Sequence, residues 1–164
     1  MSVTLKTSHG KLKIEVFCEE TPVAAKNFLA LCASGYYDNT IFHRNIKGFI
    51  VQGGDPAGTG KGGVSIYGKP FDDEINPNLK HDRRGVVSMA NSGPNTNQSQ
   101  FFITYAKHNH LNNNYTIFGK VIDGFEALDV MEREPVDGKD RPLNEIKLYC
   151  VEIHANPIAD KEQI

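Results

Sequence analysis

The sequence contains few cysteines, no long apolar run and no excess of one charge. Its three cysteines form no C-x-x-C pair, so the usual spacing of a zinc knuckle or a thioredoxin-type redox site is absent. No apolar run approaches the roughly 20 residues that a membrane span needs. The first residues also lack a signal-peptide core. We therefore expect a protein of the nucleus, the cytoplasm or both, not secreted, with no membrane contact and with reduced thiols.

The charge balance and the length limit the class of protein further. The 164 residues include 18 basic and 20 acidic side chains, a formal net charge of −2. Nucleic-acid-binding domains concentrate basic residues on one surface, so this balance argues against a direct nucleic-acid partner. A hydrophobic content of 39% is enough to build a core. The length predicts one domain, which we place at residues 1–157, followed by a short tail at 158–164.

Periodic patterns near both ends of the chain predict regular elements. Residues 3–16 alternate in polarity around a glycine turn, which is typical of a β-hairpin. A Thr-Pro pair at 21–22 is a favourable helix start, and the apolar spacing after it predicts a helix over 23–33. A second helix is predicted to start at Asp123-Gly124. A final strand over 146–153 changes the parity of its apolar positions, which predicts a bulge.

The middle of the chain, residues 41–105, has no long helical pattern. Its short apolar runs are separated by stretches rich in Gly, Pro and Asn, as in an all-β barrel or sandwich. A G-x-G-x-x-G match at 58–63 precedes a strand-like segment instead of the helix that a dinucleotide site requires, so we interpret it as a sharply turning surface loop. His108 and His110 lack a third ligand at a recognisable spacing, and no metal site is expected.

The strongest functional signal is a set of long, ordered motifs: Phe42-His43-Arg44, then 48–55 (GFIVQGGD), 88–103 (SMANSGPNTNQSQFFI) and 116–121 (TIFGKV). On these motifs the chain resembles the cyclophilins, a family of peptidyl-prolyl cis/trans isomerases, from residue 3 to about 157. Segments 29–34, 43–48 and 154–157 are similar to its spliceosome-associated peptidyl-prolyl isomerase-like 3 subtype. The resemblance implies a mainly β fold, a closed eight-stranded antiparallel barrel capped by two α-helices, with the active groove on its outer face.

Isomerisation of an Xaa-Pro bond breaks no bond, so it needs neither a nucleophile nor a cofactor. The barrier of about 18–20 kcal/mol is lost amide resonance. In the twisted state the proline nitrogen regains its lone pair, and a guanidinium binds that state better than the planar one. We predict Arg44 for this catalytic role, in agreement with the resemblance. Gln52 is predicted to hold the guanidinium, and the backbone amide of Asn91 to anchor the substrate carbonyl.

The resemblance also implies an apolar pocket for the proline ring and a neighbouring groove. The pocket residues are Phe49, Ile50, Phe102 and Leu111, and the groove residues are Ala90, Asn91, Ser92 and Gln100. Considered singly, a phenylalanine is more often a core residue and an arginine more often a solvated surface group. Their order within a match of family length favours the functional interpretation.

The chain departs from the family at several groove positions. It has no tryptophan, and His110 occupies a position where many cyclophilins have a tryptophan that donates to the inhibitor cyclosporin. A histidine can donate but offers less aromatic surface, so we expect cyclosporin binding to be weakened and catalysis to be largely kept. Tyr115 replaces a common histidine and Ile50 a common methionine, and both are expected to reshape the proline pocket.

The resemblance implies Xaa-Pro-containing peptides and proteins as substrates, spliceosomal proteins as possible partners, and a monomer without a cofactor. Two alternatives remain open. The same groove could hold Pro-containing segments within a larger assembly, with turnover incidental. A metal-dependent hydrolase would need ligands that the sequence does not spell out. Arg44 favours the enzyme, because a protein that only binds proline has no use for a cation at the twisting nitrogen.

Overall fold

A computed structural model describes residues 1–154. Residues 155–164, which contain the end of the predicted domain and the predicted tail, lie outside the described residues. The strands are β1 (Ser2–Thr7), β2 (Gly10–Val16), β3 (Thr40–Ile41), β4 (Arg44–Ile46), β5 (Ile50–Gly53), β6 (Val86–Met89), β7 (Phe101–Thr104), β8 (Ile117–Asp123) and β9 (Lys147–His154). The helices are α1 (Pro22–Ala33), α2 (Phe125–Arg133) and a 3₁₀ turn, η1 (Asn109–Leu111).

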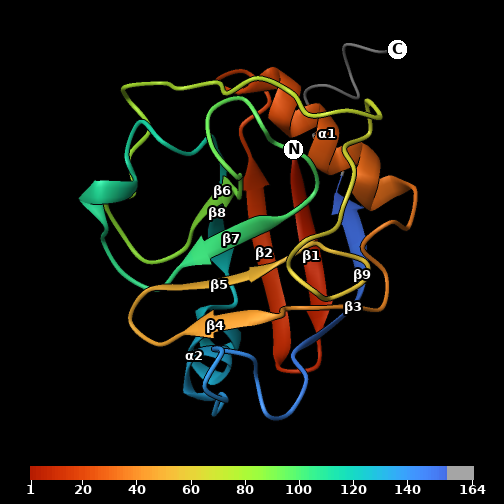
Figure 1. The fold of residues 1–164 in the computed structure, drawn as a ribbon, viewed down its shortest axis with the longest axis vertical. Helices are drawn as coiled ribbons and strands as arrows, with labels where there is room; N and C mark the ends of the chain where they lie inside the picture. Colours follow the sequence, from red (N-terminus) through yellow and green to blue (C-terminus); the bar gives the residue numbers. More distant parts are fainter. Residues whose placement is uncertain (155–164) are drawn as a thin grey trace.

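All nine strands form one antiparallel sheet in the order β3-β9-β1-β2-β8-β6-β7-β5-β4. Its two edge strands, β3 and β4, are consecutive in the chain and are separated only by Phe42 and His43. A flat sheet of nine strands would hold its edges about 38 Å apart, at about 4.8 Å per strand, whereas this link spans at most about 10 Å. The sheet must therefore curl back on itself, and Figure 1 shows its strands wrapping around one interior.

The mainly β fold with two helices is confirmed, but the details of the barrel differ from the prediction. The structure has nine strands instead of eight. Within residues 1–154 no hydrogen-bonded ladder joins β3 to β4, so the covalent link between them completes the curl. The physical reason is that the segment 40–46 changes its pairing partner: Thr40 and Ile41 pair with β9, whereas Arg44–Ile46 pair with β5.

Both helices close the interior of the sheet, and Figure 1 shows them at opposite ends of it. The helix predicted over 23–33 is confirmed as α1, and the one predicted from Asp123-Gly124 is confirmed as α2. Phe28 of α1 is fully buried against the rings of Tyr37, Phe101 and Phe118, with centroid separations of 5.6, 5.4 and 4.8 Å. We call this filled interior the barrel core.

The local predictions for the two terminal segments are also confirmed. Strands β1 and β2 pair as the predicted hairpin. In the pairing of β1 with β9, Lys6 lies opposite Cys150 and Thr7 opposite Leu148. Tyr149 is therefore the extra residue of a β-bulge, which explains the change of parity in the sequence. Neither helix in the described part of the chain is long and apolar enough to span a bilayer.

Candidate active site

Three of the predicted site residues lie in one row across neighbouring strands. Arg44 of β4 pairs with Gln52 of β5, which pairs with Phe102 of β7. Paired residues in a sheet project to the same face, and their chain neighbours project to the other. Val51 and Ile103, the neighbours in β5 and β7, are fully buried in the barrel core. The row of Arg44, Gln52 and Phe102 therefore lies on the outer face.

A second apolar cluster, separate from the barrel core, covers this outer face. Ile50, Phe102 and Leu111 are its buried members, with Phe49, Ala90 and Tyr115 packed against them. Together with Arg44, Gln52 and Asn91, these six residues line a cavity of about 170 Å³, which we call the apolar cavity. It is smaller than typical small-molecule sites of about 300–1,000 Å³, so its size suits a single side chain or ring.

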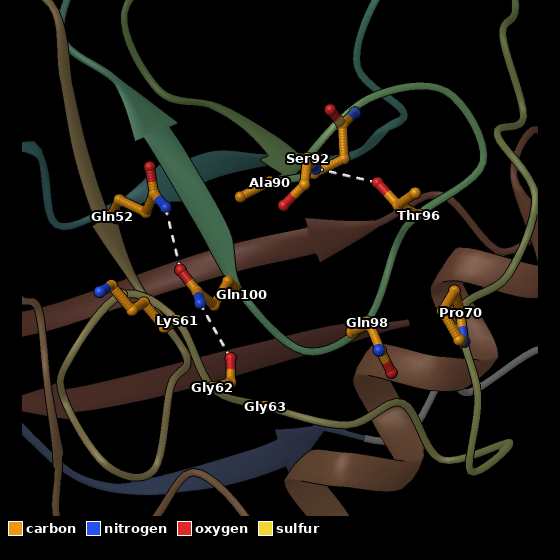
Figure 2. A pocket seen from close by; sticks show the side chains of 12 residues that line it. Gln52, Lys61, Gly62, Gly63, Pro70, Ala90, Ser92, Thr96, Gln98 and Gln100 are labelled. Carbon is orange, nitrogen blue, oxygen red and sulfur yellow. Dashed lines mark hydrogen bonds between the residues drawn. The ribbon is translucent and has the colours of Figure 1, made fainter.

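A chain of side-chain hydrogen bonds connects the cation at this cavity to a neighbouring loop. Arg44 Nη1 donates to Gln52 Oε1 at 3.4 Å, and Gln52 Nε2 donates to Gln100 Oε1 at 3.0 Å. Gln100 Nε2 in turn donates to the carbonyl oxygen of Gly62 at 2.9 Å, and Figure 2 shows these last two bonds. The predicted contact between Gln52 and the guanidinium is present. At 3.4 Å this hydrogen bond is long and therefore weak, so the exposed Arg44 side chain can change its position when a ligand binds.

The loop that supplies the Gly62 carbonyl is organised by a buried carboxylate, Asp55. Its oxygens accept hydrogen bonds from the backbone N–H groups of Ala57, Thr59, Gly60 and Gly62 at 2.8–3.1 Å. Burial raises the pKa of Asp55, but these hydrogen bonds outweigh burial and hold the pKa below its usual value. A Cβ at position 62 would lie 2.5 Å from Asp55 Oδ1. The predicted turning loop is thus confirmed, with no helix after its glycines.

The other half of the groove is a wider cavity of about 400 Å³, which we call the polar cavity. Figure 2 shows it bordered by Gln52 and Gln100 on one side and by Ala90, Ser92 and Thr96 on another. The Asn91 side chain donates to the carbonyl of Asn114 at 3.0 Å. Within residues 1–154 the Asn91 backbone N–H has no recorded partner. It lies where the apolar and polar cavities meet, so it can donate to a ligand carbonyl there.

The two histidines of the H-x-H motif make packing contacts near the apolar cavity. The exposed His110 ring stacks on Phe49, with centroids 5.8 Å apart and planes at 23°, and it does not line the apolar cavity itself. His108 lies edge-on to Phe49, and its Nε2 is 3.0 Å from the carbonyl of Gly48. Among the described residues, no group of three or more His, Cys, Asp or Glu side chains could hold a metal ion.

The sequence analysis did not identify His81, which packs against the ring of Phe102. The fully buried His81 stacks on the Phe102 ring, with centroids 6.0 Å apart and planes at 19°. Its Nε2 is 2.7 Å from Ser88 Oγ, and its Nδ1 is 3.0 Å from Asn112 Oδ1. His81 lies outside every motif described above, and a lone histidine in a sequence carries no signal of this role. Asp55 is the last residue of the 48–55 motif, but its role in organising the following loop was not predicted.

The buried histidines make stability depend on pH. Burial lowers the pKa of His81 and also that of His43, so both bind a proton less readily in the folded state than in the unfolded chain. Below a pH of about 6.5 the unfolded chain takes up protons that the folded chain does not. The free energy of unfolding therefore has its full value above that pH. It falls as the pH decreases, by at most about 1.4 kcal/mol per pH unit for each histidine.

We expect thermal unfolding followed by circular dichroism to show Tm decreasing from pH 7 to pH 5, with a shallower decrease in His81→Gln. Glutamine keeps a polar partner for Ser88 but does not titrate. Equal slopes for the two proteins would contradict the prediction.

Comparisons with known proteins agree with this geometry. The family model described as "Cyclophilin type peptidyl-prolyl cis-trans isomerase/CLD" matches residues 2–153. Peptidyl-prolyl cis-trans isomerase CYP18-1 of Arabidopsis thaliana is 70% identical over 97% of this chain and 99% of its own. Peptidyl-prolyl cis-trans isomerase-like 3 of Homo sapiens is 65% identical over the same shares. Relatives of that name confirm the predicted subtype resemblance.

A solved structure is similar in fold as well as in sequence. The crystal structure of a cyclophilin type peptidyl-prolyl cis-trans isomerase from Cryptosporidium parvum superposes with a TM-score of 0.93 at 61% identity, covering 95% of this chain and 98% of that one. A second crystal structure of that protein, with a TM-score of 0.93 at 60% identity, was obtained in the presence of the dipeptide Ala-Pro. With a full-length family match, relatives above 60% identity and the same fold, the chain belongs to the cyclophilin family of peptidyl-prolyl cis-trans isomerases.

Proposed function

We propose that this isomerase twists Xaa-Pro bonds without covalent chemistry, in the folding or remodelling of proteins. The observation that supports this mechanism is the position of Arg44 at the edge of the apolar cavity on the outer face. The proline ring occupies the apolar cavity, and the Asn91 N–H binds the carbonyl of the preceding residue. The Arg44 guanidinium donates to the proline nitrogen when its lone pair is released by twisting.

The energetics of this mechanism divide between the cation and the cavity. An acceleration of about 10⁵ requires about 7 kcal/mol. A charged hydrogen bond provides about 1.5–3 kcal/mol of that amount. Removal of water from the bond inside the apolar cavity, together with restraint of the flanking residues in the groove, provides the rest. Gln52 acts as a positioning residue, because it contacts Arg44 and Gln100 and lies between the two cavities.

The test is NMR exchange spectroscopy on a tetrapeptide with a single Ala-Pro bond. Catalytic amounts of the protein are expected to produce exchange cross-peaks between the cis and trans forms, which interconvert over tens to hundreds of seconds when uncatalysed. Chemical-shift changes should centre on Phe49, Asn91 and Phe102. Binding at these residues without faster exchange would overturn the mechanism and favour a module that only holds Pro-containing segments.

We further propose that the clients are Pro-containing proteins of the spliceosome and that the monomer works in the nucleus. The support is the likeness to relatives named peptidyl-prolyl cis-trans isomerase-like 3 and the motif resemblance to that subtype. Co-sedimentation of the protein with spliceosomal small nuclear RNAs in a nuclear extract tests the association. Sedimentation of the protein only as a free monomer, with no RNA-containing fraction, would contradict it.

Cyclosporin binding provides a separate test of the groove geometry. We expect His110→Trp to increase cyclosporin affinity by at least about tenfold, because an indole adds aromatic area and keeps an N–H donor. His110 is exposed and stacks on Phe49, so a larger ring has room on the surface. Isothermal titration calorimetry measures the affinity, and His110→Phe separates the area from the donor. Equal affinity of the wild type and His110→Trp would contradict the prediction.

A further inference from the structure

A third cavity, of about 820 Å³, adjoins the polar cavity, with which it shares Gln52, Gly60 and Lys61. Its lining includes four cationic side chains, those of Arg44, Lys61, Lys139 and Arg141, and no carboxylate. We call it the basic cavity. It shares Arg44 and Gln52 with the apolar cavity. A substrate in the apolar cavity therefore reaches the basic cavity within a few residues.

The basic cavity is assembled from three segments that are tied to one another. The Asp55 loop contributes Lys61, and the segment between α2 and β9 contributes Lys139 and Arg141. Arg141 Nη1 donates to the carbonyl of Gly58 at 2.8 Å, which joins these two segments. The N–H of Asn45 in β4 donates to the carbonyl of Asp140 at 2.8 Å, which joins the second segment to the strand that contains Arg44. The cations are thus held near one another by the fold.

The cations of this cavity are not paired with carboxylates in the described part of the chain, although Asp137 lies nearby and accepts from the backbone N–H groups of Lys139 and Arg141. None of its four cationic side chains forms an ion pair within residues 1–154. The nearby Asp55 carboxylate is already bonded to the amides of its own loop. Such a concentration of positive charge contrasts with the net charge of −2 for the whole chain. It produces a local field that attracts an anion.

A buried polar atom in the same cavity also lacks a partner. His43 lines the cavity and is only 6% exposed, and its Nδ1 has no hydrogen-bond partner. Buried polar atoms are nearly always bonded, and an exception in a cavity indicates a missing ligand or water. The unpartnered Nδ1 of this imidazole is available to donate one hydrogen bond to an oxyanion. Four cations that form no ion pair within residues 1–154, together with this ring, make a site suited to a phosphate or carboxylate group.

The direction of the substrate decides which of its residues reaches this site. In the proposed mechanism the carbonyl before proline binds Asn91, which lines the apolar and polar cavities. Residues before proline therefore extend toward the polar cavity. Residues after proline pass Arg44, which lines both the apolar and the basic cavity but not the polar cavity. We propose that the basic cavity binds a phosphoserine or an acidic side chain within the first two residues after proline, and so selects substrates by charge; this inference rests on the proposed isomerase function.

The test compares kcat/KM for peptides that differ only after proline. Serine, phosphoserine or glutamate is placed at the first or second position after an Ala-Pro pair, and exchange spectroscopy measures turnover. We expect about tenfold higher kcat/KM for the phosphoserine peptide than for the serine peptide, as for a few solvent-screened charge pairs. The ratio should decrease between about 50 mM and 500 mM salt, because the Debye length shortens. A similar gain with glutamate extends the preference to carboxylates, and a gain with phosphoserine alone restricts it to phosphate.

Matched variants assign the effect to the cavity. In Lys61→Gln/Lys139→Gln the ratio of phosphoserine to serine turnover should fall to within about twofold of one. The control, Lys11→Gln/Lys26→Gln, removes the same charge from exposed positions on β2 and α1 and should keep the wild-type ratio. Equal turnover of the two peptides by the wild type, or an equal loss in both double variants, would overturn the proposal. Failure to turn over the neutral serine peptide would instead refute the proposed isomerase mechanism.

Discussion

Arg44→Ala is expected to lower kcat/KM for Xaa-Pro isomerisation by about 10- to 150-fold, the value of a lost charged hydrogen bond of about 1.5–3 kcal/mol. Arg44 is exposed, and its recorded side-chain hydrogen bond within residues 1–154 is the 3.4 Å contact with Gln52. Its removal should therefore leave Tm within about 2 °C of the wild type. NMR exchange spectroscopy at several peptide concentrations separates kcat from KM, and the loss is expected mainly in kcat.

Two other arginine variants make this result specific. Arg83→Ala removes an exposed guanidinium whose one hydrogen-bond partner within residues 1–154 is its neighbour Asp82, at 3.1 Å, so kcat/KM should remain at the wild-type value. Arg44→Lys keeps the charge but loses the planar fork and should recover only part of the activity. If a folded Arg44→Ala protein retained full kcat, stabilisation of the twisted amide by a cation would be the wrong mechanism.

Phe102→Ala is expected to lower kcat/KM more than tenfold, whereas Phe28→Ala is expected to lower the free energy of unfolding by about 3–5 kcal/mol. Both remove a buried phenyl ring, but the rings belong to different clusters. Phe28 lies in the barrel core against three other aromatic rings. Phe102 lines the apolar cavity on the outer face. The pair therefore separates the energetics of the fold from those of the site.

Chemical denaturation and peptide exchange on the same samples measure both quantities. Activity is measured without denaturant, at a temperature at which each variant is more than nine-tenths folded. Phe28→Leu provides a milder core variant if Phe28→Ala does not fold. A folded Phe102→Ala protein with wild-type kcat/KM would show that the apolar cavity does not hold the proline ring. A folded Phe28→Leu protein with kcat/KM reduced as strongly as in Phe102→Ala would show that the two clusters are not separable.

The geometry of the outer face explains why one substrate site adjoins three cavities. Gln52 lines the apolar, polar and basic cavities, and its side chain bonds both Arg44 and Gln100. A peptide that crosses Gln52 can place its proline, its preceding residues and its following residues in different environments. In the proposed mechanism, recognition of the flanking residues and catalysis at the bond are thus coupled through the same short row of side chains.

Local patterns in the sequence determined the elements at the two ends of the chain. The hairpin, both helices and the bulge at Tyr149 were predictable because each depends on periodicity or on turn residues close in sequence. The site residues were predicted through the family resemblance of long motifs, since periodicity alone cannot distinguish Phe102 from a core phenylalanine. The nine-strand count was not predicted, because the division of the segment 40–46 depends on its pairing first with β9 and then with β5, which are distant partners in the sheet.

Only the tertiary structure decided which side chains surround Arg44. His81 supports Phe102, and Asp55 fixes the Gly62 carbonyl, but neither interaction has a local sequence signature. Lys139 and Arg141 lie about a hundred residues from Arg44 in the chain and reach it because the segment after α2 packs on β4 and on the Asp55 loop. Sequence patterns report interactions between near neighbours. The sheet curls so that its two edge strands, β3 and β4, lie close together. This curl assembles the charged surroundings of the site.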